Sequence, residues 1–278
     1  MSKSKIISVE KHGNVVVHEV EENSLREGDA VHCSIDSNRR SILMRHHTAT
    51  HIVNGAAQKL LGSWIWQHSA YKDIDMARLD ITHHAHLTRE ELLEIENMAN
   101  EVVRQNRPVN VEVLPRSKAE QEYGFRLYQG GIAPSKDIRV INIDGFDIEA
   151  CGGTHVSQTG DIGVIKLLKS ERVQDGIERL TFVAGEPAIN LLQHQEGMML
   201  GLSQTLGAQQ SRLVESVNNL KSQFDEMKKG QKLFLRKMSP HLIKEAIANA
   251  IDLGDVKLYS MDELTLDEEL HTVVGERA

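Results

Sequence analysis

The sequences HTATH at residues 47–51 and CGGTH at residues 151–155 are the two stretches around which the chain is organised. Each begins and ends with a potential metal ligand, and the four ligands are His47, His51, Cys151 and His155. Zinc favours tetrahedral sites that mix nitrogen and sulfur ligands. Three imidazoles and one thiolate form a complete set of this kind, so the joint spacing predicts one zinc ion per chain.

The local sequence indicates how the two halves of this site are built. The first two histidines are four residues apart, which puts both rings on one face of a helix, and an apolar stripe continues that helix over residues 42–61. Gly62 then ends it. The second stretch contains two adjacent glycines, which favour a tight loop with a ligand at either end. A rigid helix and a tight loop that fold together would make a preformed metal site.

Other interpretations of these residues stay open at this level. A site closed by four protein ligands is normally structural, since catalytic zinc keeps a position open for water or substrate. The residues between His47 and His51 are Thr-Ala-Thr, so the chain lacks the glutamate base that an HExxH motif supplies. Cys151 beside a histidine could instead be a nucleophile, although no oxyanion or base arrangement is visible in the sequence.

Length and composition exclude several classes of protein. The chain has 278 residues, enough for two domains or for one domain with an appendage. It has no run of 18 apolar residues and no signal peptide, so we expect no contact with a membrane. The net charge of −8 argues against a coat of basic residues for unspecific nucleic-acid binding and leaves a local basic surface open. If Cys151 binds metal, Cys33 has no partner, which suits a reducing cytoplasm.

The hydrophobic pattern predicts an α+β fold. Residues 1–40 alternate apolar and polar side chains in three candidate strands, the last at residues 30–35, and predict a partial β-barrel or antiparallel sheet. Their abrupt start suggests a piece of a longer protein. Residues 41–185 mix helical and strand patterns and predict an α/β zinc-containing domain, with Thr88 and Glu91 as the capping box of its second helix.

The pattern changes after residue 185. Apolar residues at 213, 217, 220, 224 and 227 alternate spacings of four and three and form a heptad seam that is broken at Gln210 and Gln231. Residues 186–253 therefore predict a helical, coiled-coil-like appendage. Pro240 is expected to end its long helix, with a short helix at 242–253. Residues 254–278 predict the truncated start of a C-terminal globular domain, because they are too few for a core of their own.

Two further clusters have alternative interpretations. Three histidines follow the strand predicted at residues 77–82 and are either metal ligands or solvated and capping side chains: His83, His84 and His86. Four basic residues in the last predicted strands of the domain form either a phosphate-contacting edge or a solvated face: Lys166, Lys169, Arg172 and Arg179.

Four motifs together resemble the editing domain of alanyl-tRNA synthetases. They are RHHTATH at residues 45–51, WQ at 66–67, RLD at 78–80 and EACGGTH at 149–155. The resemblance covers about residues 5–185, has an archaeal character, and extends to the related free-standing alanyl-tRNA editing proteins. The helical part then resembles the segment that precedes a small C-terminal domain in the synthetases. No synthetase catalytic core accompanies these motifs, so we do not expect the chain to activate alanine.

The resemblance implies an ester hydrolase. Its substrate would be tRNA for alanine that has been wrongly charged with serine or glycine, and its zinc ligands would be His47, His51, Cys151 and His155. The resemblance places Gln67 near the substrate, and we expect the Thr48 hydroxyl to bond to the serine side chain. Whether zinc activates water or positions the substrate stays open.

Five residues are weaker candidates for substrate or tRNA binding: Arg45, Arg78, Asp80, Lys166 and Arg172. Arg78 and Asp80 could equally pair with each other on a strand. Two functions compete with editing: a metal-stabilised RNA-binding module without catalysis, and a dimerisation fragment in which residues 187–253 form a homodimer.

Overall fold

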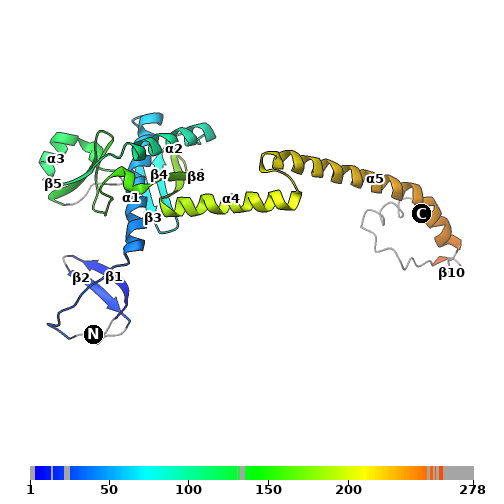
Figure 1. Ribbon diagram of the computed structural model, residues 1–278, viewed down its shortest axis with the longest axis horizontal. Helices are drawn as coiled ribbons and strands as arrows, with labels where there is room; N and C mark the ends of the chain where they lie inside the picture. The colour runs from blue at the N-terminus through cyan, green and yellow to red at the C-terminus, as the bar shows by residue number, and fades with distance from the viewer. Residues whose placement is uncertain are drawn as a thin grey trace. The chain divides into compact units, whose positions relative to one another are not determined.

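The computed structural model describes residues 4–13, 15–21, 26–129, 131, 135–248, 251–252, 254 and 257–258. The chain divides into two units, residues 1–189 and 190–278. Helices and antiparallel sheets alternate along the first unit, as the sequence predicts, and the described strands form no closed barrel (Figure 1).

The N-terminal segment is a β-hairpin. Strands β1 (Ile6–His12) and β2 (Val15–Val20) pair antiparallel, and most of their side chains are exposed. The antiparallel pairing agrees with the prediction, but residues 30–35 form no strand. A third strand needs a buried face to stabilise it, and this hairpin offers none, since its apolar side chains face solvent on both sides.

The main sheet has the strand order β3-β4-β9-β8, and all its neighbours are antiparallel. Its strands are β3 (Gln67–Lys72), β4 (Ala77–Thr82), β8 (Ile165–Gln174) and β9 (Ile177–Ala184). Helix α1 (Ser37–Leu61) packs on β3, β4 and β9, and helix α2 (Arg89–Arg104) packs on α1 and β8 (Figure 1). The main core lies between these two layers.

The sequence explains why these helices form and which face they bury. Asp36 caps α1, because its carboxylate accepts the Arg39 N–H at 2.9 Å, so the helix begins five residues before the predicted start at 42. The predicted capping box of Thr88 and Glu91 is present at the start of α2. The buried stripe of α1 has helical spacing and contributes Ala49, Ile52, Val53, Ala56 and Ala57 to the core.

A second, three-stranded sheet carries one half of the predicted metal site. Its order is β5-β6-β7, and its strands are β5 (Val109–Pro115), β6 (Asp137–Ile143) and β7 (Asp147–Ala150). Helix α3 (Arg116–Tyr123) and the 3-10 helix η1 (Phe125–Leu127) close a small core on this sheet. The 3-10 helix η2 (Thr159–Ile162) follows the CGGTH loop.

Helices dominate the rest of the chain. Helix α4 (Glu186–Leu206) is followed by the 3-10 helix η3 (Gln210–Arg212), helix α5 (Leu213–Ala248) and two short paired strands, β10 (Ile251–Asp252) and β11 (Lys257–Leu258). The predicted C-terminal domain at 254–278 lies almost entirely outside the described residues. Among the residues described, no helix is long and apolar enough to cross a bilayer.

The prediction that Pro240 ends the long helix is wrong. Helix α5 continues through Pro240 to Ala248 as one element. A proline inside a helix removes the N–H that would bond to the carbonyl four residues before it, here that of Arg236. The Ser239 hydroxyl donates to this Arg236 carbonyl at 3.1 Å and replaces the missing hydrogen bond.

Candidate metal centre

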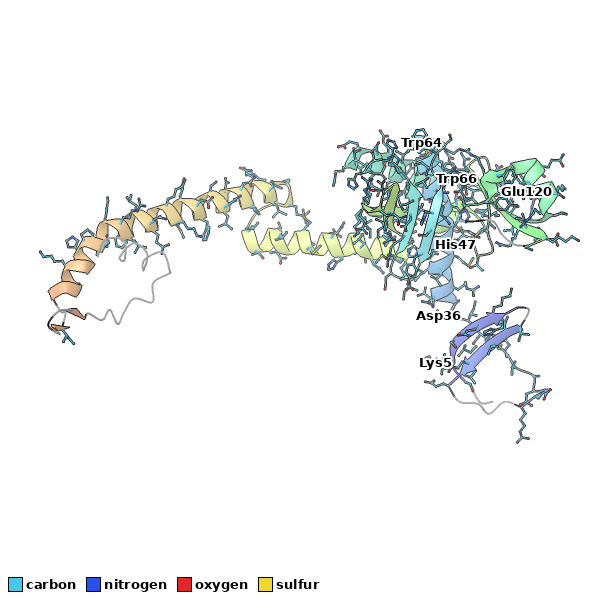
Figure 2. All side chains as sticks on the ribbon, turned by 180° about the vertical axis from the view of Figure 1, so that it is seen from behind. Lys5, Asp36, His47, Trp64, Trp66 and Glu120 are labelled. Carbon is cyan, nitrogen blue, oxygen red and sulfur yellow. The ribbon has the colours of Figure 1, made fainter. Side chains whose placement is uncertain are left out.

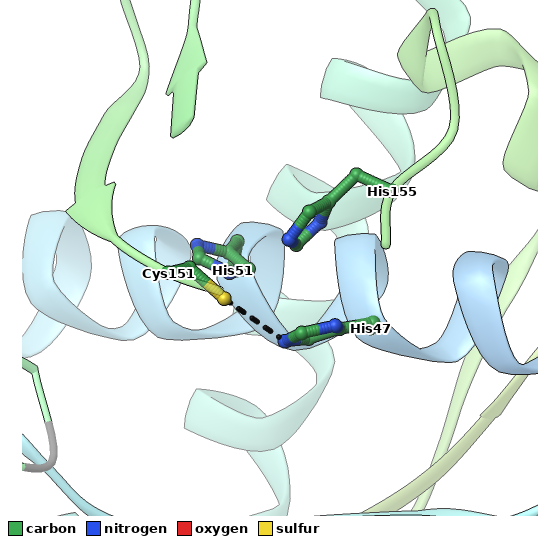
Figure 3. A group of neighbouring side chains, drawn as sticks. All are labelled: His47, His51, Cys151 and His155. Carbon is green, nitrogen blue, oxygen red and sulfur yellow. Dashed lines mark hydrogen bonds between the residues drawn. The ribbon is translucent and has the colours of Figure 1, made fainter. Parts of the chain in front are cut away.

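The four predicted ligands converge on one point. His47 and His51 project from the same face of α1, Cys151 follows the end of β7, and His155 lies on the loop after it (Figure 3). One ligand atom from each of the four residues lies within 4.8 Å of the others. The Sγ atom of Cys151 is 3.3 Å from Nε2 of His47. Figure 2 places His47 on α1 within the densely packed part of the domain.

Arg139 of β6 fixes the backbone of the CGGTH loop. Its Nη1 donates to the carbonyl oxygens of Cys151 at 2.7 Å and of Gly153 at 2.8 Å. The N–H of Cys151 in turn donates to the Arg139 carbonyl at 3.0 Å. One guanidinium therefore holds the loop at two carbonyls and restricts the direction in which the thiol points.

Two of the histidines contact other side chains through the Nδ1 atom of the ring. Nδ1 of His51 lies 3.0 Å from Oε2 of Glu149 and 3.2 Å from Oδ2 of Asp147. Nδ1 of His155 lies 3.3 Å from the Thr48 hydroxyl. When an Nδ1 carries the proton and donates it to such a partner, the Nε2 lone pair is free for a metal.

The residues fit a zinc ion. Nε2 of His155 is buried and has no hydrogen-bond partner, which is costly unless a ligand occupies that position. The neighbouring rings are close, with centroids 4.3 Å apart for His47 and His155 and 4.8 Å apart for His51 and His155. Three imidazoles and a thiol, with one imidazole nitrogen that has no other partner, form a donor set typical of zinc.

Electrostatics prepare the thiol and the His155 ring as ligands. Burial raises the pKa of Cys151, but the close imidazoles of His155, His47 and His51 outweigh burial and lower that pKa to about 2. Burial is the main reason that the pKa of His155 falls to about 4. The group therefore presents a thiolate and a neutral imidazole near neutral pH, and these are the forms that bind metals.

The pKa values of His51 and of the carboxyl group of Asp147 beside it are shifted in the opposite direction, upward. Burial disfavours the charged form of His51, yet the charge of Glu149 and the bond to Asp147 raise its pKa well above the ordinary value. Burial and the nearby Glu149 raise the pKa of Asp147 to about 7. Both acids are buried, so two carboxyl groups and one imidazole share a small space with little water.

Of the two predicted catalytic residues, Thr48 is the one in contact with a ligand. It is fully buried, and its hydroxyl donates to the Met44 carbonyl at 3.0 Å and accepts the Val156 N–H at 3.2 Å in addition to contacting His155. Its hydrogen-bonding capacity is thus used inside the protein. Gln67 begins β3, and its N–H donates to the side-chain oxygen of Gln129 at 2.9 Å.

The weaker candidates all have partners within the chain. Nε of Arg45 donates to the Asp161 carbonyl at 2.9 Å, and the Arg78 guanidinium lies 5.1 Å from the centre of the Tyr71 ring. Asp80 pairs with Arg179 through two bonds of 2.7 and 2.9 Å. The alternative that Arg78 and Asp80 pair with each other is therefore not what the structure has.

The basic residues are also paired, and so is one residue of the histidine cluster, His86. Lys166 bonds to Glu96 at 2.8 Å, and Arg172 pairs with Asp175. Nδ1 of His86 lies 2.8 Å from the buried Glu178. Within the part of the chain that the structure describes, two groups of residues are close enough to hold a metal: the four predicted ligands, and His51 with Asp147 and Glu149. Neither group includes His83, His84 or His86.

Sequence reasoning missed several residues around the metal centre. Asp147 and Glu149 precede Cys151 by four and two residues, so the alternation of a strand puts all three on one face. That spacing is a signal that could have been read. Lys72 is half-buried, and burial lowers its pKa, although the charges of Cys151 and Glu149 raise it in part. No comparable signal in the sequence points to this residue, because it lies on a strand far from these residues along the chain.

Comparison with known proteins agrees with the four motifs. Residues 138–181 match the family described as the threonyl and alanyl tRNA synthetase second additional domain. The alanine–tRNA ligase of Nitrosopumilus maritimus is 44% identical over 88% of this chain, which covers 26% of that protein. The enzyme of Thermococcus kodakarensis is 41% identical over 96% of this chain, and the match covers 29% of that enzyme. The enzyme of Pyrococcus furiosus is 41% identical over 94% of this chain, and the match again covers 29% of that enzyme. The chain thus spans less than a third of these relatives, and it is homologous to one segment of the archaeal alanine–tRNA ligases.

Proposed function

We propose that this chain hydrolyses the ester bond of tRNA for alanine that has been wrongly charged with serine or glycine. The observation that carries the proposal is the convergence of His47, His51, Cys151 and His155 in a chain homologous to alanine–tRNA ligases. These enzymes form aminoacyl esters on tRNA, as their name says, and a hydrolytic site within such an enzyme would remove the wrong ones.

A bound zinc ion would supply a Lewis acid that can polarise a carbonyl or lower the pKa of water. The chain's own residues would hold it through three ring nitrogens and the Cys151 thiolate. The ligand side chains are not sealed from solvent, since Gly152 and Thr154 of the loop are exposed and Cys151 and His47 are half-buried. A substrate can therefore approach this side, which favours a reactive site over a purely structural one.

We propose two different contributions for the residues beside the ligands. Gln67 would contact the aminoacyl group from the start of β3. Thr48 would favour serine over alanine, since a site that satisfies a substrate hydroxyl rejects the analogue that lacks it. Glycine lacks the hydroxyl as well, so its acceptance would rest on its smaller size. Because the Thr48 hydroxyl already contacts His155, Met44 and Val156, this second contribution competes with a positioning role.

The test is deacylation of tRNA for alanine charged with serine, with glycine and with alanine, by the wild-type chain. Rapid loss of serine and glycine but not of alanine is expected. Cys151→Ala should abolish it, and Cys33→Ala is the matched control, because Cys33 is exposed and belongs to neither group of metal-capable residues that the structure describes. If zinc-loaded protein binds the tRNA without releasing serine, the proposed hydrolase activity is wrong, and the chain is an RNA-binding module.

Contacts with the tRNA are proposed for Arg45, Arg78, Asp80, Lys166 and Arg172. A residue that neutralises a phosphate weakens binding when removed and reduces the salt dependence of the affinity by about one unit of slope. Lys166→Ala and Arg172→Ala are the variants to compare with wild type in tRNA binding at several salt concentrations. An unchanged slope in both would assign these residues to their internal pairs with Glu96 and Asp175.

We also propose that residues 187–253 pair two chains. The cysteines are free, which suits a reducing cytoplasm, and we propose that location for the protein. Helix α5 exposes the apolar side chains of the predicted seam, namely Val217, Leu220, Phe224 and Met227. Such a stripe is typical of a helix that packs against another. A change from dimer to monomer on deletion of residues 187–278, measured by sedimentation, supports the proposal, and an unchanged monomer in both chains contradicts it.

A further inference from the structure

The buried polar groups behind His51 extend beyond the carboxylates that contact it. Asn54 lies three residues after His51 on the same face of α1 and is completely buried. Its Nδ2 donates to Oε1 of Glu149 at 2.7 Å. Since Oε2 of the same carboxylate faces Nδ1 of His51 at 3.0 Å, Glu149 is held at both oxygens, between two residues of one helix.

The chain of contacts continues to the strand that carries Gln67. Nδ2 of Asn54 also donates to Oε1 of Gln129 at 3.4 Å, and this oxygen accepts the Gln67 N–H at 2.9 Å. Nε2 of Gln129 donates to the Arg126 carbonyl at 3.1 Å, which fixes the orientation of the amide. A ladder of side chains therefore joins a metal ligand to the backbone of Gln67.

We propose that Glu149, Asn54 and Gln129 are positioning residues that couple the metal ligand His51 to the strand start at Gln67. They neither bind metal nor touch the substrate. Glu149 sets the ring orientation and tautomer of His51, Asn54 transmits that position, and Gln129 places the Gln67 peptide accordingly. The inference rests on the proposed function in that the four ligands bind a metal and Gln67 is there assigned to the substrate.

The two carboxylates on His51 are not equivalent in this arrangement. Glu149 faces a donor at each of its oxygens, Nδ1 of His51 and Nδ2 of Asn54, so it needs two acceptor oxygens. Asp147 shares the same Nδ1 of His51 through a hydrogen bond of 3.2 Å, which uses a single oxygen. A glutamine at 149 has one acceptor and would leave one donor unsatisfied, whereas an asparagine at 147 can still face His51 with its oxygen.

The first experiment compares Glu149→Gln with Asp147→Asn in their affinity for cobalt(II), read from the visible absorption of the bound ion without any tRNA. We expect Glu149→Gln to weaken binding about 10- to 100-fold and Asp147→Asn to stay within about threefold of wild type. Equal losses in the two variants would overturn the assignment of Glu149. If Glu149→Gln does not fold, Asn54→Leu replaces it, because it leaves the same carboxylate oxygen without a donor, and unaltered cobalt affinity would then count against the ladder.

The second experiment measures amide hydrogen exchange at Gln67 with and without zinc. In wild type we expect zinc to slow exchange of this N–H, because the ladder stiffens as His51 is held. Gln129→Met removes the acceptor and should abolish the zinc effect while cobalt affinity stays within about threefold of wild type. A zinc effect that persists in Gln129→Met would overturn the coupling. Since neither readout uses tRNA, a wild-type chain without deacylase activity would end the proposed function and leave this inference standing.

Discussion

The backbone of Gly153 lies directly against the imidazole of His47. A Cβ atom at position 153 would lie 2.0 Å from Cε1 and 2.4 Å from Nδ1 of that ring, closer than non-bonded atoms approach. The two residues belong to the two separate halves of the site, the loop and the helix. Contact between them is what lets the CGGTH loop bring Cys151 to within 3.3 Å of His47.

Substitution of Gly153 by alanine should therefore displace His47 and weaken metal binding about 10-fold or more, as loss of support for a ligand commonly does. Gly152→Ala is the matched control, because a Cβ at 152 meets no atom within 4 Å. Zinc affinity is measured by competition with a chelator. Similar affinities for the two variants would show that the loop adjusts without cost.

Arg139→Met should also weaken zinc binding, by about 10-fold, because it removes both bonds that hold the Cys151 and Gly153 carbonyls. Methionine keeps the unbranched apolar stem of the side chain without its donors. The control is Arg126→Met, since Arg126 is exposed and donates to a single carbonyl, that of Ser63, at 3.4 Å. Unaltered zinc affinity in Arg139→Met would mean that the loop holds its shape without the guanidinium.

Thr48→Val separates the two roles of the hydroxyl. If Thr48 selects the substrate, loss of the hydroxyl slows release of serine far more than release of glycine, and zinc affinity is unchanged. If it positions His155, both substrates are slowed alike and zinc affinity falls, since Nδ1 of His155 loses its partner at 3.3 Å. Because the hydroxyl is buried and has three partners, we expect the second pattern, with rescue by Thr48→Ser.

Asp80→Asn should destabilise the domain by about 2 kcal/mol at neutral pH, because it breaks a mostly buried pair with Arg179. Burial raises the pKa of Asp80, but its bonds to Arg179 and Ser69 outweigh burial and leave that pKa below its ordinary value. A carboxylate with a depressed pKa contributes stability above its unfolded pKa and loses it as the pH falls through the folded pKa. The difference in unfolding free energy between wild type and variant should therefore shrink from pH 5 towards pH 2.

Denaturant unfolding at several pH values measures this difference. Asp175→Asn provides the comparison, because Asp175 pairs with Arg172 at a fully exposed position and should give no measurable change at any pH. A gap between wild type and Asp80→Asn that stays constant down to pH 2 would contradict the role assigned to the Asp80 carboxylate.

Much of the fold could be predicted because local patterns were strong. The capping box at Thr88, the apolar stripe of α1 and the glycines of the CGGTH loop act within a few residues, so the sequence indicates the elements directly. The prediction failed at Pro240, where a local rule was offset by a hydroxyl one residue away, and at residues 30–35, where an alternating pattern had no partner strand.

By itself, the sequence determined the donor set of the candidate metal site and the local scaffold of each half. The i, i+4 spacing of a helix and the glycines of a tight loop follow from short-range geometry, which needs no knowledge of the fold. Only the tertiary structure decided what stands behind the ligands. Glu149 with Asn54, Arg139 with the loop carbonyls, and Thr48 with His155 are contacts between segments about 95, 12 and 107 residues apart, and sequence separation gives no distance in space until the sheets and helices have packed.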